Sequence, residues 1–142
     1  MADTPPRTAG SPPAQDTDVV IIGGGPAGCA AARMAASVGM RSILIEPDVL
    51  CRNLYRVPAL NNVLGGHTNG PELADSITAE LRSTQLCRLE LGRYVTELRA
   101  DDAQVTVTVD TGARLTAPYA IVATGVGPSS PATLPGSPPP AA

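Results

Sequence analysis

The sequence predicts an α/β fold in which a parallel sheet with helices carries an attached antiparallel β-meander. Two short apolar runs, at 18–22 and 42–45, flank a helical segment of small residues, which is the β-α-β pattern of a parallel sheet. Between 87 and 117, apolar and polar residues alternate and are interrupted by turn residues, as in a meander. A last apolar run, "AIVA" at 120–123, supplies a final apolar strand.

The length and charge of the chain limit its classes of function. It has 142 residues, enough for one domain, and a net charge of −3, which gives no electrostatic basis for binding nucleic acid or an anionic membrane. Residues 1–17 and 126–142 are rich in Pro, Ala, Ser and Thr, and we predict a disordered leader and a flexible tail around a folded domain at 18–125. No stretch has the pattern of a secretory signal or the roughly 20 apolar residues of a membrane span, so a cytoplasmic protein is expected.

Two helices are expected. The first covers 26–38 and is dominated by alanine; the second covers 69–83, with Asn69 or Gly70 as its cap. Residues 51–68, between the second strand and this helix, show little periodicity and are expected to be a long connection. The apolar face of the second helix is formed by residues four positions apart, Leu73, Ile77 and Leu81.

The predicted strands after the second helix are only half-buried. In "CRLEL", at 87–91, Cys87, Leu89 and Leu91 alternate with charged residues and are expected on one face. The meander consists of "YVTELR", "QVTVTV" and "RLTA", at 94–99, 104–109 and 114–117. Its middle strand places three valines on one side, Val105, Val107 and Val109, opposite Thr106 and Thr108.

A glycine motif, G-x-G-x-x-G, lies between the first strand and the first helix. Gly23 permits a tight turn, Gly25 leaves room for a pyrophosphate against the backbone, and Gly28 lets the helix pack closely on the strand. Pro26 and Ala27 lie within the motif, at the helix end whose free N–H groups and dipole attract an anion. The motif therefore predicts a dinucleotide site, and a glycine turn without a ligand is the alternative.

An acidic residue ends the second predicted strand. Glu46 follows Gly28 by 18 residues, where a dinucleotide-binding unit has the carboxylate that accepts hydrogen bonds from a ribose diol. The negative charge would repel a 2′-phosphate, which disfavours NADP at this site. FAD and NAD remain as candidates.

Three segments together resemble the FAD domain of two-dinucleotide-fold flavoproteins. They are "DVVIIGGGPAG", "ILIE" and "APYAIVATG", and the last ends in Ala123, Thr124 and Gly125, the place of the second FAD signature of that family. The resemblance implies a Rossmann-like FAD-binding domain at 18–125, with FAD as the cofactor and the turn at 123–125 close to it.

The segment "CRNLYRVPALNNVLGGHTNGPEL", at 51–73, is similar to thioredoxin-reductase-like members of the pyridine nucleotide-disulfide oxidoreductase superfamily, and is closest to the branch that includes small-molecule dithiol oxidases. This resemblance implies that Asn53 and Asn62 lie near the flavin, and that Val95 borders the adenine through its backbone. Some members have His beside the second Asn, where this chain has Asn61.

The resemblance implies an FAD-dependent oxidoreductase that oxidises a small-molecule thiol or a similar substrate. In that family an NAD(P)H domain follows, with a second glycine motif that these 142 residues do not contain. We therefore expect an incomplete enzyme whose site is completed by a second copy or by a partner chain. The alternatives are a non-catalytic flavin-binding module or half-enzyme, a truncated remnant, and a plain NAD-binding domain.

The candidate catalytic residues are Cys51 and His67. Cys51 could act as a thiol beside the flavin or be an ordinary loop cysteine; His67 could donate to flavin or substrate, or be a solvated loop histidine. Cys29, in the first helical turn, is either a reactive thiol or a small packing residue, and the latter is favoured, while Cys87 is expected in the core. One histidine and scattered acids predict no metal site.

Overall fold

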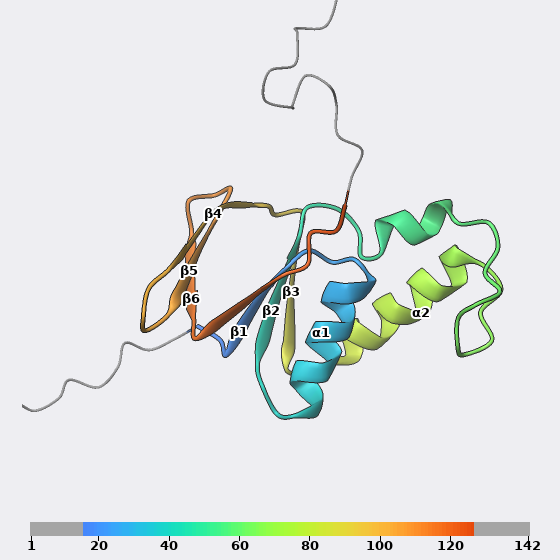
Figure 1. Ribbon diagram of the computed structural model, residues 1–142, viewed down its shortest axis with the longest axis horizontal. Helices are drawn as coiled ribbons and strands as arrows, with labels where there is room; N and C mark the ends of the chain where they lie inside the picture. The colour runs from blue at the N-terminus through green and yellow to red at the C-terminus, as the bar shows by residue number, and fades with distance from the viewer. Residues whose placement is uncertain (1–15, 127–142) are drawn as a thin grey trace, which may run out of the picture.

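The computed structural model describes residues 16–126 and shows three layers (Figure 1). The elements in chain order are β1 (Val19–Ile22), α1 (Pro26–Ser37), β2 (Ser42–Glu46), the 3-10 helix η1 (Arg52–Arg56), α2 (Gly70–Ser83), β3 (Cys87–Leu91), β4 (Val95–Ala100), β5 (Val105–Val109), β6 (Arg114–Ala117) and β7 (Tyr119–Val122). A parallel sheet of order β3-β2-β1-β7 lies between the two α-helices and an antiparallel sheet of order β4-β5-β6. The predicted fold class is confirmed.

Strand β1 lies inside the parallel sheet because its four residues are apolar and can be buried on both faces. Successive side chains of a strand point to opposite faces. Val19 and Ile21 therefore join the core cluster under the helices, whereas Val20 and Ile22 join the cluster under the antiparallel sheet. One continuous apolar run thus supports two separate cores.

The helix side of the core is built from small residues that let α1 and α2 approach the sheet. Ala32 and Ala74 are fully buried there, together with Leu81. Ala74 packs in the core with residues of α1 and the sheet, whereas Leu73, which the predicted face of α2 placed inward, is only half-buried. Leu91, the last residue of β3, is also exposed, whereas it was expected on the same half-buried face as Cys87 and Leu89.

Asn69 caps α2, and its side-chain oxygen accepts a hydrogen bond from the backbone N–H of Glu72 at 2.9 Å. The connection at 51–68, expected to lack regular structure, contains η1. Helix α2 packs closely on η1 because Gly70 has no side chain: a Cβ there would overlap the carbonyl oxygen of Leu54.

The meander follows the predicted pattern. Val107 and Val109 are buried under the parallel sheet and Val105 packs against them, which confirms the inward face of β5. A register shift between Val95 and Glu97 marks a bulge at the start of β4.

Contacts of the fold extend to Asp16 and Thr17, ahead of the domain start predicted at residue 18. Thr17 is 1% exposed and its hydroxyl donates to the carbonyl of Arg41 at 2.8 Å, while the Asp16 carboxylate accepts from the N–H of Thr116 at 2.8 Å. The rest of the predicted leader, and the predicted tail beyond Val126, lie outside the described residues. Within residues 16–126, no helix combines the length and apolar character that a bilayer crossing requires.

Candidate dinucleotide-binding site

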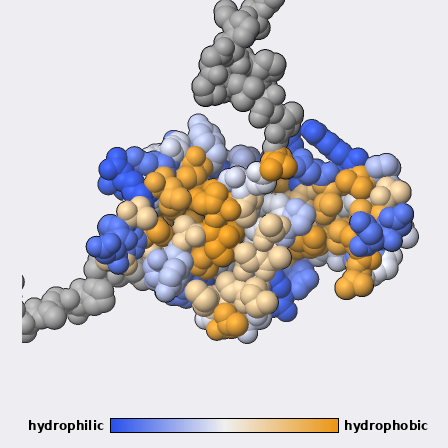
Figure 2. All heavy atoms as spheres, in the orientation of Figure 1, coloured by the Kyte–Doolittle hydropathy of each residue, from blue (hydrophilic) through white to orange (hydrophobic). Residues whose placement is uncertain are grey.

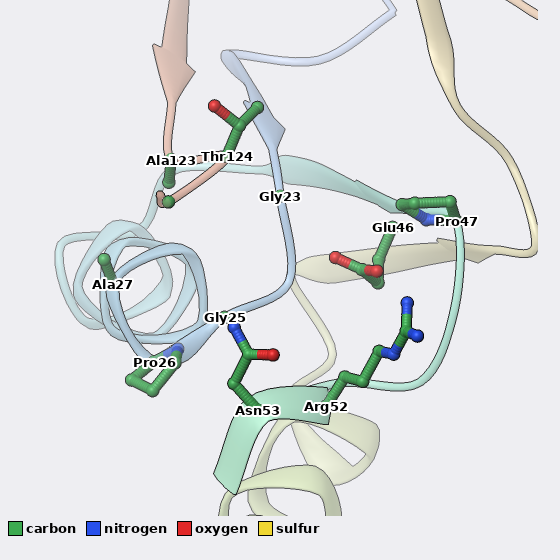
Figure 3. A pocket seen from close by; sticks show the side chains of 11 residues that line it. Gly23, Gly25, Pro26, Ala27, Glu46, Pro47, Arg52, Asn53, Ala123 and Thr124 are labelled. Atoms are coloured by element: carbon green, nitrogen blue, oxygen red, sulfur yellow. The ribbon is translucent and has the colours of Figure 1, made fainter. Parts of the chain in front are cut away.

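A pocket of about 400 Å³ opens at the carboxyl ends of three neighbouring parallel strands (Figure 3). Ile22 of β1 pairs with Ile45 of β2 on one side and with Val122 of β7 on the other. The residue that follows each of these positions therefore reaches the same edge of the sheet. Ligands of open α/β sheets bind at this edge, where connections leave a strand in opposite directions. The pocket is lined by Gly23, Gly25, Pro26, Ala27, Glu46, Pro47, Arg52, Asn53, Ala123, Thr124 and Gly125.

The three motif glycines have different surroundings. Gly23 has φ +108° and lies against the carbonyl of Ala123, so a side chain there would be strained and would overlap that oxygen. A Cβ on Gly28 would overlap the carbonyl oxygen of Gly23, so this glycine lets α1 start close to β1. At Gly25, in contrast, a Cβ would meet no atom within 4 Å. The glycine loop is therefore tightly packed at Gly23 and Gly28, and it is open toward the pocket at Gly25.

The amino end of α1 faces the pocket without a capping group. Gly25 is the N-cap residue, no side chain bonds to the free N–H groups, and the first turn contains no acidic residue. Those N–H groups and the positive end of the helix dipole favour an anion at this position. A diphosphate fits here because the open face of Gly25 lets it approach the backbone.

Glu46 forms the opposite wall, and its carboxylate is oriented by the backbone. One oxygen accepts from the N–H of Gly24 at 2.7 Å and the other from the N–H of Asp48 at 3.0 Å. A carboxylate offers about four acceptor positions, so two remain for a ligand. The side chain therefore holds the glycine loop and still presents free acceptor capacity to the pocket.

Two lining residues were missed by the sequence reasoning. Arg52 rises from η1 toward Glu46 in Figure 3, and its Nε lies 3.2 Å from an oxygen of Asp48. Pro47 lines the pocket because it directly follows Glu46. The sequence signal that could have identified them is position, because Pro47 follows Glu46 and Arg52 precedes Asn53, and both neighbours were predicted site residues.

Most of the predicted cofactor residues come together in the pocket, and three do not line it. Gly28 lies beneath the loop and packs α1 on β1, as its place in the motif predicts. Asn62 is exposed in the connection before α2, and Val95 begins β4 and packs against the core under the antiparallel sheet. Contact of Asn62 and Val95 with a cofactor stays a prediction.

Neither candidate catalytic residue lines the pocket. Cys51 is buried rather than an ordinary loop cysteine, because a left-handed backbone, φ 56°, turns it inward against Cys29. Cys29 and Cys87 are buried as expected; the contact with Cys51 and burial raise the pKa of Cys29, and burial raises the pKa of Cys87. His67 lies half-buried in the loop before α2. Among residues 16–126, no three histidine, cysteine or acidic side chains are grouped to hold a metal ion.

Comparison with known proteins agrees with this geometry. The profile of the pyridine nucleotide-disulphide oxidoreductase family matches residues 17–141. A ferredoxin–NADP reductase of Granulibacter bethesdensis is 30% identical over 133 residues, which cover 87% of this chain and 36% of the relative.

Solved structures with the same fold include a thioredoxin reductase of Lactococcus lactis, at 27% identity and a TM-score of 0.73, and a ferredoxin-flavin thioredoxin reductase of Clostridium acetobutylicum, at 28% and 0.73. The matches cover 84% and 81% of this chain, and 39% of each of those chains. The chain thus spans less than half the length of the proteins it matches. It belongs to the pyridine nucleotide-disulphide oxidoreductase family, and its cofactor is FAD.

Proposed function

We propose that this chain supplies the FAD-binding part of an oxidoreductase that exchanges electrons with a thiol or disulfide substrate. The observation that supports it is the convergence of the glycine loop, Glu46 and the turn at 123–125 on one pocket at the carboxyl ends of β1, β2 and β7.

Each wall of the pocket has a distinct task in this proposal. The diphosphate lies against the amino end of α1, where Gly25 leaves space and the free N–H groups attract its charge. Glu46 bonds the ribose hydroxyls through its remaining acceptor positions, and its charge repels a 2′-phosphate. Arg52 and Asn53, brought in by η1, close a further side of the pocket, and in Figure 3 Arg52 points toward Glu46 and Asn53 toward Gly25.

The substrate class follows from the relatives and from the segment at 51–73. When bound, FAD supplies the group that accepts and releases two electrons, while the protein binds and orients it. Relatives of this chain are named as reductases of thioredoxin and of ferredoxin, or, for a Caenorhabditis elegans protein that is 42% identical over 55 residues, as a dihydrolipoyl dehydrogenase. Two of these names refer to dithiol–disulfide couples, and the segment at 51–73 resembles small-molecule dithiol oxidases. A small-molecule thiol is therefore the proposed reductant.

The test has two steps, which separate the cofactor site from the substrate. The purified chain is mixed with FAD, freed of excess by gel filtration, and examined for protein-bound flavin absorbance, with excess NAD as competitor. Dithiothreitol is then added without oxygen, and free FAD serves as the control. We expect retained flavin that NAD does not displace and that the dithiol reduces faster than free FAD. A folded protein that retains no flavin contradicts the site; retained flavin reduced no faster than free FAD contradicts the substrate class.

A half-enzyme that requires a partner chain is the second candidate, and an exposed apolar strand favours it. Strand β7 is at the edge of the parallel sheet, with Ile121 40% and Val122 61% exposed. Figure 2 shows hydrophobic atoms gathered over this strand and the adjacent antiparallel sheet. Unpaired edges and apolar patches of this kind favour association. Sedimentation of a Val122→Lys variant as monomer, with the wild type associated, would support this candidate; a monomeric wild type would oppose it.

A further inference from the structure

Cys29 and Cys51 come into contact although they lie 22 residues apart. Cys29 belongs to the first turn of α1, and Cys51 is the residue before η1. Their sulfur atoms are 3.9 Å apart, and the two residues are 2% and 1% exposed. Neither thiol lines the dinucleotide pocket, so the proposed function leaves the pair unexplained.

The backbone brings the two thiols together beneath the glycine loop. Cys51 is the one residue other than glycine with positive φ in the described part of the chain, and its N–H donates to the carbonyl of Gly24 at 2.8 Å. The Cys29 sulfur lies 3.4 Å from the same carbonyl oxygen. A left-handed conformation at a residue with a side chain is strained and persists only where surrounding contacts impose it. The glycine loop thus imposes the approach of Cys51 to Cys29.

We propose that Cys29 and Cys51 form a reversible disulfide that ties the amino end of α1 to η1. A disulfide requires sulfur atoms about 2.05 Å apart, so the pair must close from 3.9 Å. The bridge would join two walls of the pocket, because Pro26 and Ala27 follow from one element and Arg52 and Asn53 from the other.

The two thiols differ in acidity in the direction that this reaction requires. The contact between the two sulfur atoms lowers the pKa of the Cys51 thiol and raises that of Cys29, and burial raises the pKa of Cys29 further. Cys51 therefore supplies the thiolate, which is the nucleophile in thiol oxidation. Cys87, also buried, makes no such sulfur contact within the described residues.

Hydrogen peroxide is the oxidant class that we assign, because it is small enough to reach a buried thiol. The Cys51 thiolate attacks one peroxide oxygen, the O–O bond breaks, and the released hydroxide takes up a proton to become water. The resulting sulfenic acid is attacked by the Cys29 sulfur, the S–O bond breaks, and a second water leaves as the S–S bond forms. In total the two thiols lose two electrons and two protons, and one peroxide becomes two waters.

The experiment exposes the folded, reduced chain to hydrogen peroxide, then unfolds it, alkylates the free thiols and maps peptides by mass spectrometry. The wild type is expected to lose two of its three free thiols and to give one linked peptide pair containing Cys29 and Cys51. Dithiothreitol should restore both thiols. The matched control Cys87→Ser should form the same bridge, and Cys51→Ser should form none. The peptide masses distinguish oxidation of methionine from the loss of a free thiol.

Stability gives a second readout that needs no variant. A bridge closing a loop of this size should raise the thermal unfolding midpoint on the order of 10 °C, and dithiothreitol should reverse the rise. Three free thiols in the treated folded protein, when a denatured sample oxidises under the same conditions, would overturn the proposal. A bridge that includes Cys87, or a bridged protein with a lower midpoint, would also overturn it. No flavin enters the assay, so its result is independent of the proposed function.

Discussion

Gly25 and Gly28 lie in the same motif, yet alanine at each position should damage a different property. Gly28→Ala places a methyl group over the carbonyl oxygen of Gly23 and 3.0 Å from its carbonyl carbon. Both atoms belong to backbone, so they cannot swing aside and α1 must move away from β1. Overpacking of this kind costs about 3 kcal/mol, the upper end of its usual range.

Gly25→Ala should leave the fold almost unchanged and weaken cofactor binding. A Cβ there meets no atom within 4 Å, and the backbone at φ −71° and ψ 179° suits any residue. Alanine is a poorer N-cap than glycine, but it also reduces the entropy of the unfolded chain, so the net change should stay within about 1 kcal/mol. The methyl group takes the space proposed for the diphosphate. We expect the dissociation constant for FAD to rise at least about tenfold, or roughly 1.4 kcal/mol.

The assay compares both variants with the wild type in urea unfolding, followed by circular dichroism, and in calorimetric titration with FAD. The expected result is a stable Gly25→Ala that binds weakly and a destabilised Gly28→Ala. Unchanged FAD affinity in Gly25→Ala would refute the placement of the diphosphate at the glycine loop. Wild-type stability in Gly28→Ala would refute the close contact between helix and strand.

Three further substitutions test individual side chains. Glu46→Gln replaces a charged acceptor of ribose hydroxyls by a neutral one, so calorimetry should show roughly tenfold weaker FAD binding; equal affinity would exclude that contact. Asn69→Ala removes the cap of α2 and should lower the free energy of unfolding in urea by about 1 kcal/mol, and no change would mean that the cap contributes nothing. Hydrogen bonds from the backbone N–H and the hydroxyl of Thr68 lower the pKa of Glu72 in the folded protein. As the pH falls through the ordinary glutamate range, the unfolded chain therefore binds a proton at Glu72 before the folded protein does, and stability is lost. Wild-type stability should therefore fall in that range more steeply than that of Glu72→Gln, and parallel urea midpoints would contradict this.

The order of strands and helices could be predicted because it depends on local patterns. The apolar run of β1, the glycines that follow it and the valine alternation of β5 each specify an element within a few residues. The parallel register then aligns the ends of β1, β2 and β7, and this alignment brings Gly23, Glu46 and Ala123 together. Most of the pocket was predictable for this reason.

What the sequence did not reveal depends on contacts between distant residues. The left-handed turn at Cys51 is imposed by the Gly24 carbonyl, so its burial against Cys29 has no local signal. Arg52 reaches the pocket only because η1 forms after that turn. Whether Leu73 or Ala74 is buried likewise depends on how closely α1 approaches α2, and periodicity alone does not determine that distance.

The most direct test of the central claim, that the ADP half of FAD occupies the pocket at the carboxyl ends of β1, β2 and β7, is a titration of the isotope-labelled chain with FAD, followed by amide NMR. The predicted result is a cluster of shifted amides at Gly23, Gly25, Glu46 and 123–125, with small changes in the antiparallel sheet. Shifts confined to another surface, or none at FAD concentrations that saturate the protein in calorimetry, would contradict the account.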